Sequence, residues 1–162
     1  MDKAFSNEDI SNYLNSHVKI VPYDQLINYD TIDELLEPYN KVALLYLTKQ
    51  NFGHWCCLWL NKGILNFFDS YGGVPDSELK MIPQYFKAQS NQLKPALTYL
   101  MYNGPYPVNY NQYRLQKFAE GVNTCGRWVC VRLKYPDITE DKFYDLFTED
   151  GLNPDSLVVT LT

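Results

Sequence analysis

The sequence lacks the features that mark membrane, secreted and nucleic-acid-binding proteins. No apolar run is long enough to cross a bilayer, and the polar segment from Met1 to Ser11 has no apolar signal-peptide core. No tract of Lys and Arg is present. The 14 basic and 19 acidic side chains leave a net charge of −5, which disfavours general binding to phosphate backbones. We therefore expect an intracellular protein in a reducing compartment, neither secreted nor attached to a membrane.

Cysteine and histidine are scarce. The chain contains only Cys56, Cys57, Cys125, Cys130, His17 and His54 of these two types. No C-x-x-C pair occurs, so a zinc site would need an unusual ligand set, and we expect neither a metal nor a cofactor. A disulfide framework is not expected without a signal segment. Free thiols in a reducing compartment raise the question of nucleophilic chemistry.

Apolar and aromatic residues are plentiful. Hydrophobic residues make up 46% of the 162 positions and aromatic residues 15%, which excludes a largely disordered chain. We find no internal repeat, low-complexity tract or dividing linker. The length predicts one domain over residues 1–162.

The hydrophobic pattern predicts an α+β fold, with a small central, mainly antiparallel sheet flanked by helices. Expected helical segments are a capped helix after Ser6, a turn over 31–36, 76–86 with a kink at Pro83, 125–134, and a last helix that begins near Asp137 and ends at Phe147. Expected strands are 42–47, 54–60, 64–69, 97–102 and a short one at 114–116. The segment 103–110 is expected to be an irregular loop.

Cys125 is the best candidate for a nucleophile. It begins a predicted helix, where backbone N–H groups and the helix dipole favour a thiolate and can form half of an oxyanion hole. Gly126 follows and allows a substrate to approach the backbone closely. His54 begins a strand and can act as the base, and Asp69 ends the neighbouring strand and can orient it.

The strand register has to bring His54 and Asp69 to one face. A three-residue loop at 61–63 would pair Leu60 with Ile64 and so place His54 and Asp69 on opposite faces. A one-residue bulge would repair this, and we state it as a requirement of the triad. Each residue also has an ordinary explanation: Cys125 as a buried helix residue, His54 as a satisfied strand-end histidine, and Asp69 as a turn cap. Cys56, Cys57 and Cys130 are expected to serve packing.

The set of motifs resembles the adenain/Ulp1-like cysteine peptidases, the family of the adenovirus maturation protease and its SUMO-protease relatives. The resemblance rests on His54-Trp55, on Phe68-Asp69-Ser70-Tyr71-Gly72, on Gln116, and on Asn123-Thr124-Cys125-Gly126. It covers about residues 42–133. The order His, Asp, Gln, Cys matches the family and is the reverse of the papain order.

The resemblance implies a role for each matching residue. It makes Cys125 the nucleophile, His54 the base and Asp69 the residue that orients His54. It also implies an oxyanion glutamine. Gln116 is the closest candidate, although it lies nine residues before the cysteine, farther than is usual in the family, and Gln112 is the alternative.

Aromatic residues are expected to shape the substrate site. Trp55 matches the aromatic residue that follows the family's histidine. Together with tyrosines such as Tyr71, Tyr106 and Tyr110, it could wall a narrow tunnel that admits glycine.

The resemblance also implies the substrate class. Relatives either process viral capsid and scaffold proteins after small residues or remove ubiquitin-like modifiers, and the short chain favours the first, in the host cytoplasm or nucleus or in the virion. The adenovirus enzyme is stimulated by DNA and by a peptide. The net charge disfavours DNA here, and an activating peptide stays open. An inactive binding or structural module, or an acyl transferase with the same triad, are the alternatives.

Overall fold

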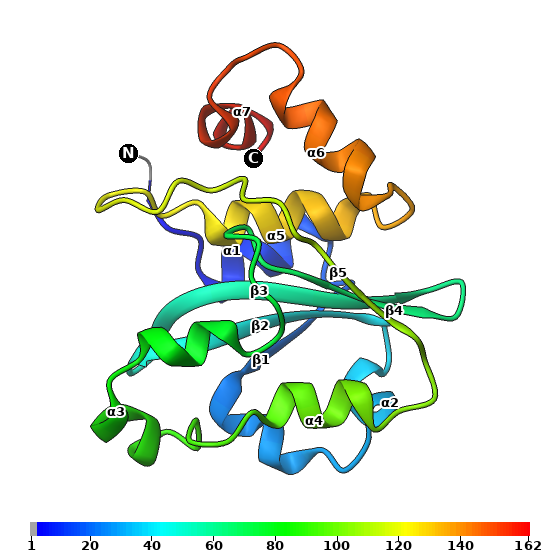
Figure 1. The fold of residues 1–162 in the computed structure, drawn as a ribbon, viewed down its shortest axis with the longest axis vertical. Helices are drawn as coiled ribbons and strands as arrows, with labels where there is room; N and C mark the ends of the chain where they lie inside the picture. Colours follow the sequence, from blue (N-terminus) through cyan, green and yellow to red (C-terminus); the bar gives the residue numbers. More distant parts are fainter. Residues whose placement is uncertain (1–2) are drawn as a thin grey trace.

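A five-stranded sheet forms the centre of the structure, a computed structural model that describes residues 3–162. The strands follow one another across the sheet in chain order as β1 (Lys19–Pro22), β2 (Lys41–Lys49), β3 (Phe52–Asn61), β4 (Ile64–Phe68) and β5 (Val108–Tyr110). The central pairs β2–β3 and β3–β4 are antiparallel, and the two edge pairs are parallel. The predicted α+β fold with a mainly antiparallel sheet is confirmed (Figure 1).

Helices cover both faces of the sheet (Figure 1). One face carries α1 (Asn7–Tyr13) and α5 (Cys125–Lys134), with α6 (Glu140–Thr148) and α7 (Pro154–Leu161) lying beyond α5. The other face carries α2 (Ile32–Leu36), α3 (Gln84–Gln89), α4 (Ala96–Tyr102) and two 3-10 helices, η1 (Tyr23–Asn28) and η2 (Ser77–Met81). Within residues 3–162, no helix combines the length and the apolar character needed to cross a membrane.

β3 is buried on both sides. Trp55, Cys57 and Trp59 belong to the core beneath α5, whereas Cys56 and Leu58 belong to the core on the opposite face. Because both faces are covered, the strand is a continuous apolar run instead of an alternating one. The cysteines of this strand are therefore packing residues, as expected.

The turn between β3 and β4 is one residue shorter than predicted. Lys62 and Gly63 form a two-residue turn with φ values of 52° and 76°, which is typical of the tight hairpin turn that matches strand twist. Asn61 therefore pairs with Ile64, and the predicted pairing of Leu60 with Ile64 is wrong.

This register removes the need for a bulge between β3 and β4. The observed ladder ends with Cys57 opposite Phe68, and the same spacing continues to Cys56 opposite Asp69. His54 and Asp69 then fall on one face, since residues two apart share a face. The register shift that does occur lies between β2 and β3, at Leu47/Lys49.

Several helices agree with the sequence pattern. α1 has Ser6 as its N-cap with a capping box to Asp9, α2 is capped by Thr31, and α5 has the predicted bounds. The helix expected over 76–86 is broken before Pro83 into η2 and α3. The last predicted helix, α6, is capped by Thr139 instead of Asp137.

Other expectations were wrong. The segment 97–102 is the helix α4 instead of a strand, because Leu97, Leu100 and Met101 are buried at helical spacing while Tyr99 is 70% exposed. The segment 114–116 is not a strand. The strand in this part of the chain is β5, which lies inside the segment 103–110 that was expected to be irregular. The helix α7 was not predicted.

Candidate active site

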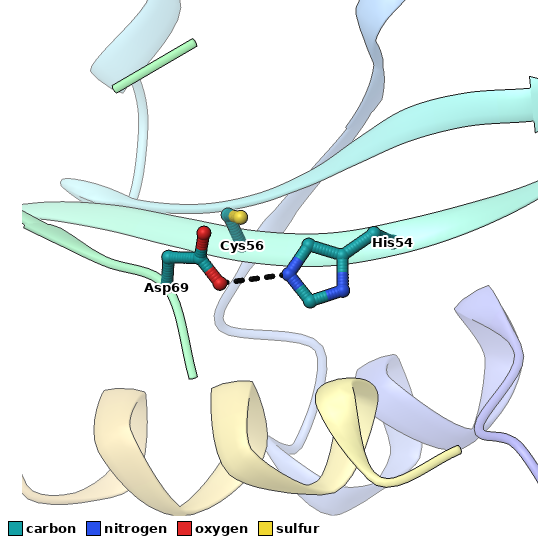
Figure 2. Close-up of side chains that lie close together, drawn as sticks. All are labelled: His54, Cys56 and Asp69. Carbon is teal, nitrogen blue, oxygen red and sulfur yellow. Dashed lines mark hydrogen bonds and ion pairs between the residues drawn. The ribbon is translucent and has the colours of Figure 1, made fainter. Parts of the chain in front are cut away.

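A buried histidine–carboxylate pair lies where β3 begins and β4 ends. His54 Nε2 lies 2.8 Å from Asp69 Oδ1, and the two residues are 6% and 2% exposed. Figure 2 shows the ring and the carboxylate facing each other beside β3, with Cys56 next to them. The contact assigns Nε2 to Asp69, which leaves Nδ1 to face another group.

Asp69 is held on several sides. The Tyr71 backbone N–H donates to Asp69 Oδ1 (2.9 Å), so one carboxylate oxygen accepts two hydrogen bonds. Asn111 brackets the backbone, since Asp69 N–H donates to Asn111 Oδ1 and Asn111 Nδ2 donates to Asp69 O, both at 2.9 Å. A Cβ on Gly73 would lie 2.9 Å from Asp69 Oδ2 and closer still to Ser77, so this close turn requires a glycine. No sequence pattern indicated a role for Asn111.

The surroundings of His54 favour the imidazolium. Burial lowers the pKa of His54, but its neighbours Cys56, Asp69 and Cys125 outweigh burial and raise that pKa well above its usual range. Burial raises the pKa of the Cys56 thiol well above its usual range as well, which keeps this thiol neutral. The charge that stabilises the protonated ring therefore comes chiefly from Asp69. Tyr71 stacks on the ring at 4.6 Å between centroids and fixes its plane.

Cys125 is the first residue of α5, and its side chain lies near His54. Its Sγ accepts a hydrogen bond from the Trp55 backbone N–H at 3.4 Å, and its side chain lies close enough to the His54 ring to help raise the pKa of that ring. The first-turn N–H groups of α5 have no partner inside the helix. The structure thus brings together the three predicted triad residues from α5, β3 and the end of β4.

Gln116 lies next to the triad, in the segment before α5. It is 1% exposed. Its Oε1 accepts from Ser70 Oγ at 2.7 Å, and its Nε2 donates to Tyr71 Oη at 3.2 Å and to the Val122 carbonyl at 3.1 Å. The Ser70 hydroxyl thereby orients the amide with its donor end toward the cleft. The Tyr71 contact is the longer of the two donor bonds, and a substrate oxygen could replace it.

Three other predicted residues lie elsewhere. Gln112 is exposed, and its backbone N–H donates to Glu140, so the structure favours Gln116 as the amide beside Cys125. Tyr106 donates to Asp33 at 2.6 Å. Tyr110 belongs to β5, and neither tyrosine lines the cleft. The expectation that these two tyrosines wall a tunnel was wrong.

A cleft of about 1030 Å³ opens onto the triad. Its described lining includes the aromatic residues Phe5, Phe52, Trp55, Tyr71 and Phe118. Only two charged side chains, His54 and Glu78, are among the lining residues that the structure describes. Burial raises the pKa of the Glu78 carboxyl, and nearby His54 opposes the shift.

Trp55 and Gly126 meet at the edge of this cleft. Trp55 Nε1 donates to the Phe5 carbonyl at 3.1 Å. A Cβ on Gly126 would lie 2.8 Å from Phe5 Cβ and 3.2 Å from Trp55 Cδ1. In the free protein, Gly126 therefore allows α5 to pack closely against these two residues. Contact of Gly126 with a substrate stays a prediction.

The other thiols are chemically quiet. Burial raises the pKa of Cys57, and burial with nearby Asp9 raises the pKa of Cys130 to about 12. The donor atoms of His54, Cys56 and Asp69 lie within 4.8 Å of one another. Two of these donors already form the 2.8 Å pair and the third is a protonated thiol, so this group serves as a hydrogen-bonded pair with a neutral neighbour.

The chain is similar to a virophage protein in sequence and to a viral protease in structure. No family model matches the sequence. The "Uncharacterized protein V9" of the Sputnik virophage is 43% identical over 164 residues, which cover 98% of this chain and 94% of that protein. The chain belongs to the family of this virophage protein. Among solved structures, the ASFV pS273R protease aligns with a TM-score of 0.47 and 13% identity over 86% of this chain, and the chain spans 61% of that protein's length.

Proposed function

We propose that the protein is a cysteine endopeptidase whose triad is Cys125, His54 and Asp69. The observation that carries the proposal is the buried 2.8 Å His54–Asp69 pair with the Cys125 side chain near the His54 ring, at the start of a helix and open to a large cleft. A thiol beside an imidazole base, which is itself oriented by a carboxylate, is the arrangement that activates a cysteine nucleophile.

The residues support a complete peptide hydrolysis. The Cys125 sulfur attacks the scissile carbonyl carbon, and the developing oxyanion accepts hydrogen bonds from the Cys125 N–H and from Gln116 Nε2. The His54 imidazolium donates its proton to the leaving amine as the C–N bond breaks. The neutral ring then takes a proton from water, whose oxygen attacks the acyl carbon, and the S–C bond breaks to release the acid and restore the Cys125 thiolate beside the His54 imidazolium.

We further propose that the substrates are capsid or scaffold proteins of a virophage-type virus, cleaved after small residues such as glycine during virion maturation. The family relationship to a virophage protein supports the viral setting. Trp55 and Tyr71 form aromatic walls of the cleft near Cys125, and these walls support a narrow passage that favours a substrate residue without a side chain. Such an enzyme would act in the infected cell or in the particle, and an activating peptide is compatible with the open cleft.

Alkylation by iodoacetamide, followed by peptide mass spectrometry across a pH series, tests the reactive pair. We expect iodoacetamide to alkylate Cys125 faster than the other three cysteines at neutral pH, because this thiol alone both lies beside His54 and lines the cleft. His54→Ala should slow this reaction. Alkylation of Cys125 that resembles an ordinary thiol and is unchanged in His54→Ala would contradict the proposal.

Cleavage assays with Gly-containing peptides from virophage capsid proteins test the activity itself. Cys125→Ala should abolish cleavage. Cys130→Ala is the matched control, because it removes a thiol from the same helix on a face away from the cleft. Cleavage that survives in Cys125→Ala would exclude this thiol as nucleophile. Cleavage of a ubiquitin-like precursor in preference to every capsid peptide would overturn the substrate assignment alone.

A further inference from the structure

Asp155 is a buried carboxylate that the proposed reaction does not use. It lies in the first turn of α7, is 2% exposed and accepts three hydrogen bonds. The donors are Thr124 Oγ1 at 2.7 Å and Trp128 Nε1 at 3.1 Å, both to Oδ1, and the Lys117 backbone N–H at 2.9 Å, to Oδ2. No lysine or arginine side chain is among these donors. The carboxylate is therefore stabilised by neutral donors and by the positive end of α7.

Two of these donors adjoin the catalytic groups. Lys117 directly follows Gln116, and Thr124 directly precedes Cys125. The chain between them has no regular secondary structure, and residues 117–121 are exposed. One carboxylate thus joins the two ends of the loop that separates the oxyanion amide from the nucleophile. Such a bond fixes the distance between them without touching either group.

The same carboxylate changes how α5 begins. Thr124 occupies the N-cap position of α5, but its hydroxyl makes no capping bond to the helix. That hydroxyl donates to Asp155 instead. The first-turn N–H groups of α5 are consequently left available, and the Cys125 N–H is the one that the proposed oxyanion would use.

We infer that Asp155 is a positioning residue for the oxyanion hole, an inference that rests on the proposed function. It holds Gln116 and the start of α5 at the separation that a tetrahedral oxyanion requires. Its effect should appear in reactions that form an oxyanion at Cys125 and be absent from reactions of the same sulfur that form none.

Two small probes separate these reactions without knowledge of the natural substrate. With p-nitrophenyl acetate, the Cys125 sulfur bonds to the ester carbonyl carbon through a tetrahedral oxyanion, and p-nitrophenolate leaves with the bonding electron pair. With iodoacetamide, the sulfur displaces iodide from a saturated carbon, and no oxyanion forms. The ratio of the acylation rate constant to the alkylation rate constant reports how well the oxyanion hole works, since both reactions depend equally on the thiolate.

Asp155→Asn should lower the acylation rate about tenfold or more and change alkylation of Cys125 less than about twofold. Thr124→Val, which keeps the side-chain shape but loses the hydroxyl donor, should act in the same direction, and Thr124→Ser should restore the ratio. Val158→Ala is the matched control, because it loosens the buried side of α7 and keeps the carboxylate. We expect it to lower Tm and leave the ratio unchanged.

The outcomes distinguish this inference from the proposed function. Fast alkylation and a p-nitrophenolate burst in the wild type, with an unchanged rate ratio in folded Asp155→Asn and Thr124→Val, would overturn the inference and leave the peptidase proposal intact. A ratio lowered equally by Val158→Ala would show that α7 acts through general stability. A wild-type Cys125 that reacts like an ordinary thiol with both probes would overturn the proposed function itself.

Discussion

At the scale of single residues, the proton carried by His54 depends on Asp69. The pKa of His54 is lowered by burial but raised further by its neighbours, of which Asp69 makes the 2.8 Å contact. A raised histidine pKa means that the ring stays protonated to higher pH than usual. The imidazolium that must protonate the leaving amine therefore persists into the neutral range, and activity should decline only when the pH rises through this raised pKa.

Replacing the carboxylate tests this dependence. Asp69→Asn should move the basic limb of the kcat/KM profile to lower pH, since the imidazolium loses its charged partner, and should reduce kcat/KM at pH 8 roughly 100-fold. Measurement of initial rates from pH 5 to 10 on the best capsid peptide checks both effects. A basic limb that stays in place in a folded Asp69→Asn variant would show that Asp69 does not set the His54 pKa.

The same pair links stability to pH. A histidine whose folded pKa is raised stabilises the fold fully below its unfolded pKa, about 6.5, and loses that contribution as the pH rises through the folded value. We expect the Tm of His54→Ala to approach that of the wild type as the pH increases from 6 to 10. Differential scanning fluorimetry at matched ionic strength measures this, and a Tm difference that widens with pH would contradict it.

At the scale of elements, the contact between α5 and the N-terminal segment supports the site. A methyl group on Gly126 would lie 2.8 Å from Phe5 Cβ and 3.2 Å from Trp55 Cδ1, so one of these neighbours must shift. Gly126→Ala should cost about 1–3 kcal/mol of unfolding free energy, as overpacking does, and should lower kcat/KM because Trp55 N–H contacts the Cys125 sulfur. Urea unfolding and peptide cleavage test the two parts. An unchanged unfolding midpoint would mean that the Phe5 segment moves away freely.

Elements with a local signal could be predicted from the sequence, and those set by distant contacts could not. α1 and α5 were found because a cap or an apolar period lies within each segment itself. The sequence pattern of α4 predicts a strand wrongly, because its run of apolar and aromatic residues fits the helix period and the strand period equally well. Only the burial of one side of the segment distinguishes the two. α7 was missed because its packing depends on α5, and nothing near Asp155 in the sequence indicates the donors it meets.

The candidate site followed the same rule. His54, Asp69 and Cys125 could be proposed because each lies at the end of an element with a clear pattern. Their register could not, because a hairpin turn of two or three residues leaves the same sequence pattern while exchanging the faces of the strand. Lys62 and Gly63, both at positive φ, decide it.

At the scale of the whole molecule, the excess of acidic side chains and the cleft together restrict the substrate. The chain carries a net charge of −5. Among its described lining, the cleft offers no lysine or arginine, and Glu78 is the one acidic side chain there. An acidic substrate residue near Glu78 would therefore meet a like charge, and no lysine or arginine side chain would compensate it.

Peptides with Asp or Glu beside the cleaved bond should accordingly be poor substrates, and Glu78→Gln should improve their cleavage relative to neutral peptides about threefold to tenfold. Because burial raises the pKa of Glu78, this carboxylate is neutralised at higher pH than an ordinary glutamate, and the discrimination should weaken as the pH falls toward 5.

Competition between matched Glu and Gln peptides, followed by mass spectrometry at several pH values, measures the ratio of their cleavage rates directly. Gln25, a neutral lining residue, provides the matched control as Gln25→Asn, which should leave the ratio unchanged. A preference for neutral peptides that persists in Glu78→Gln at every pH would assign the selection to the shape of the cleft instead of its charge.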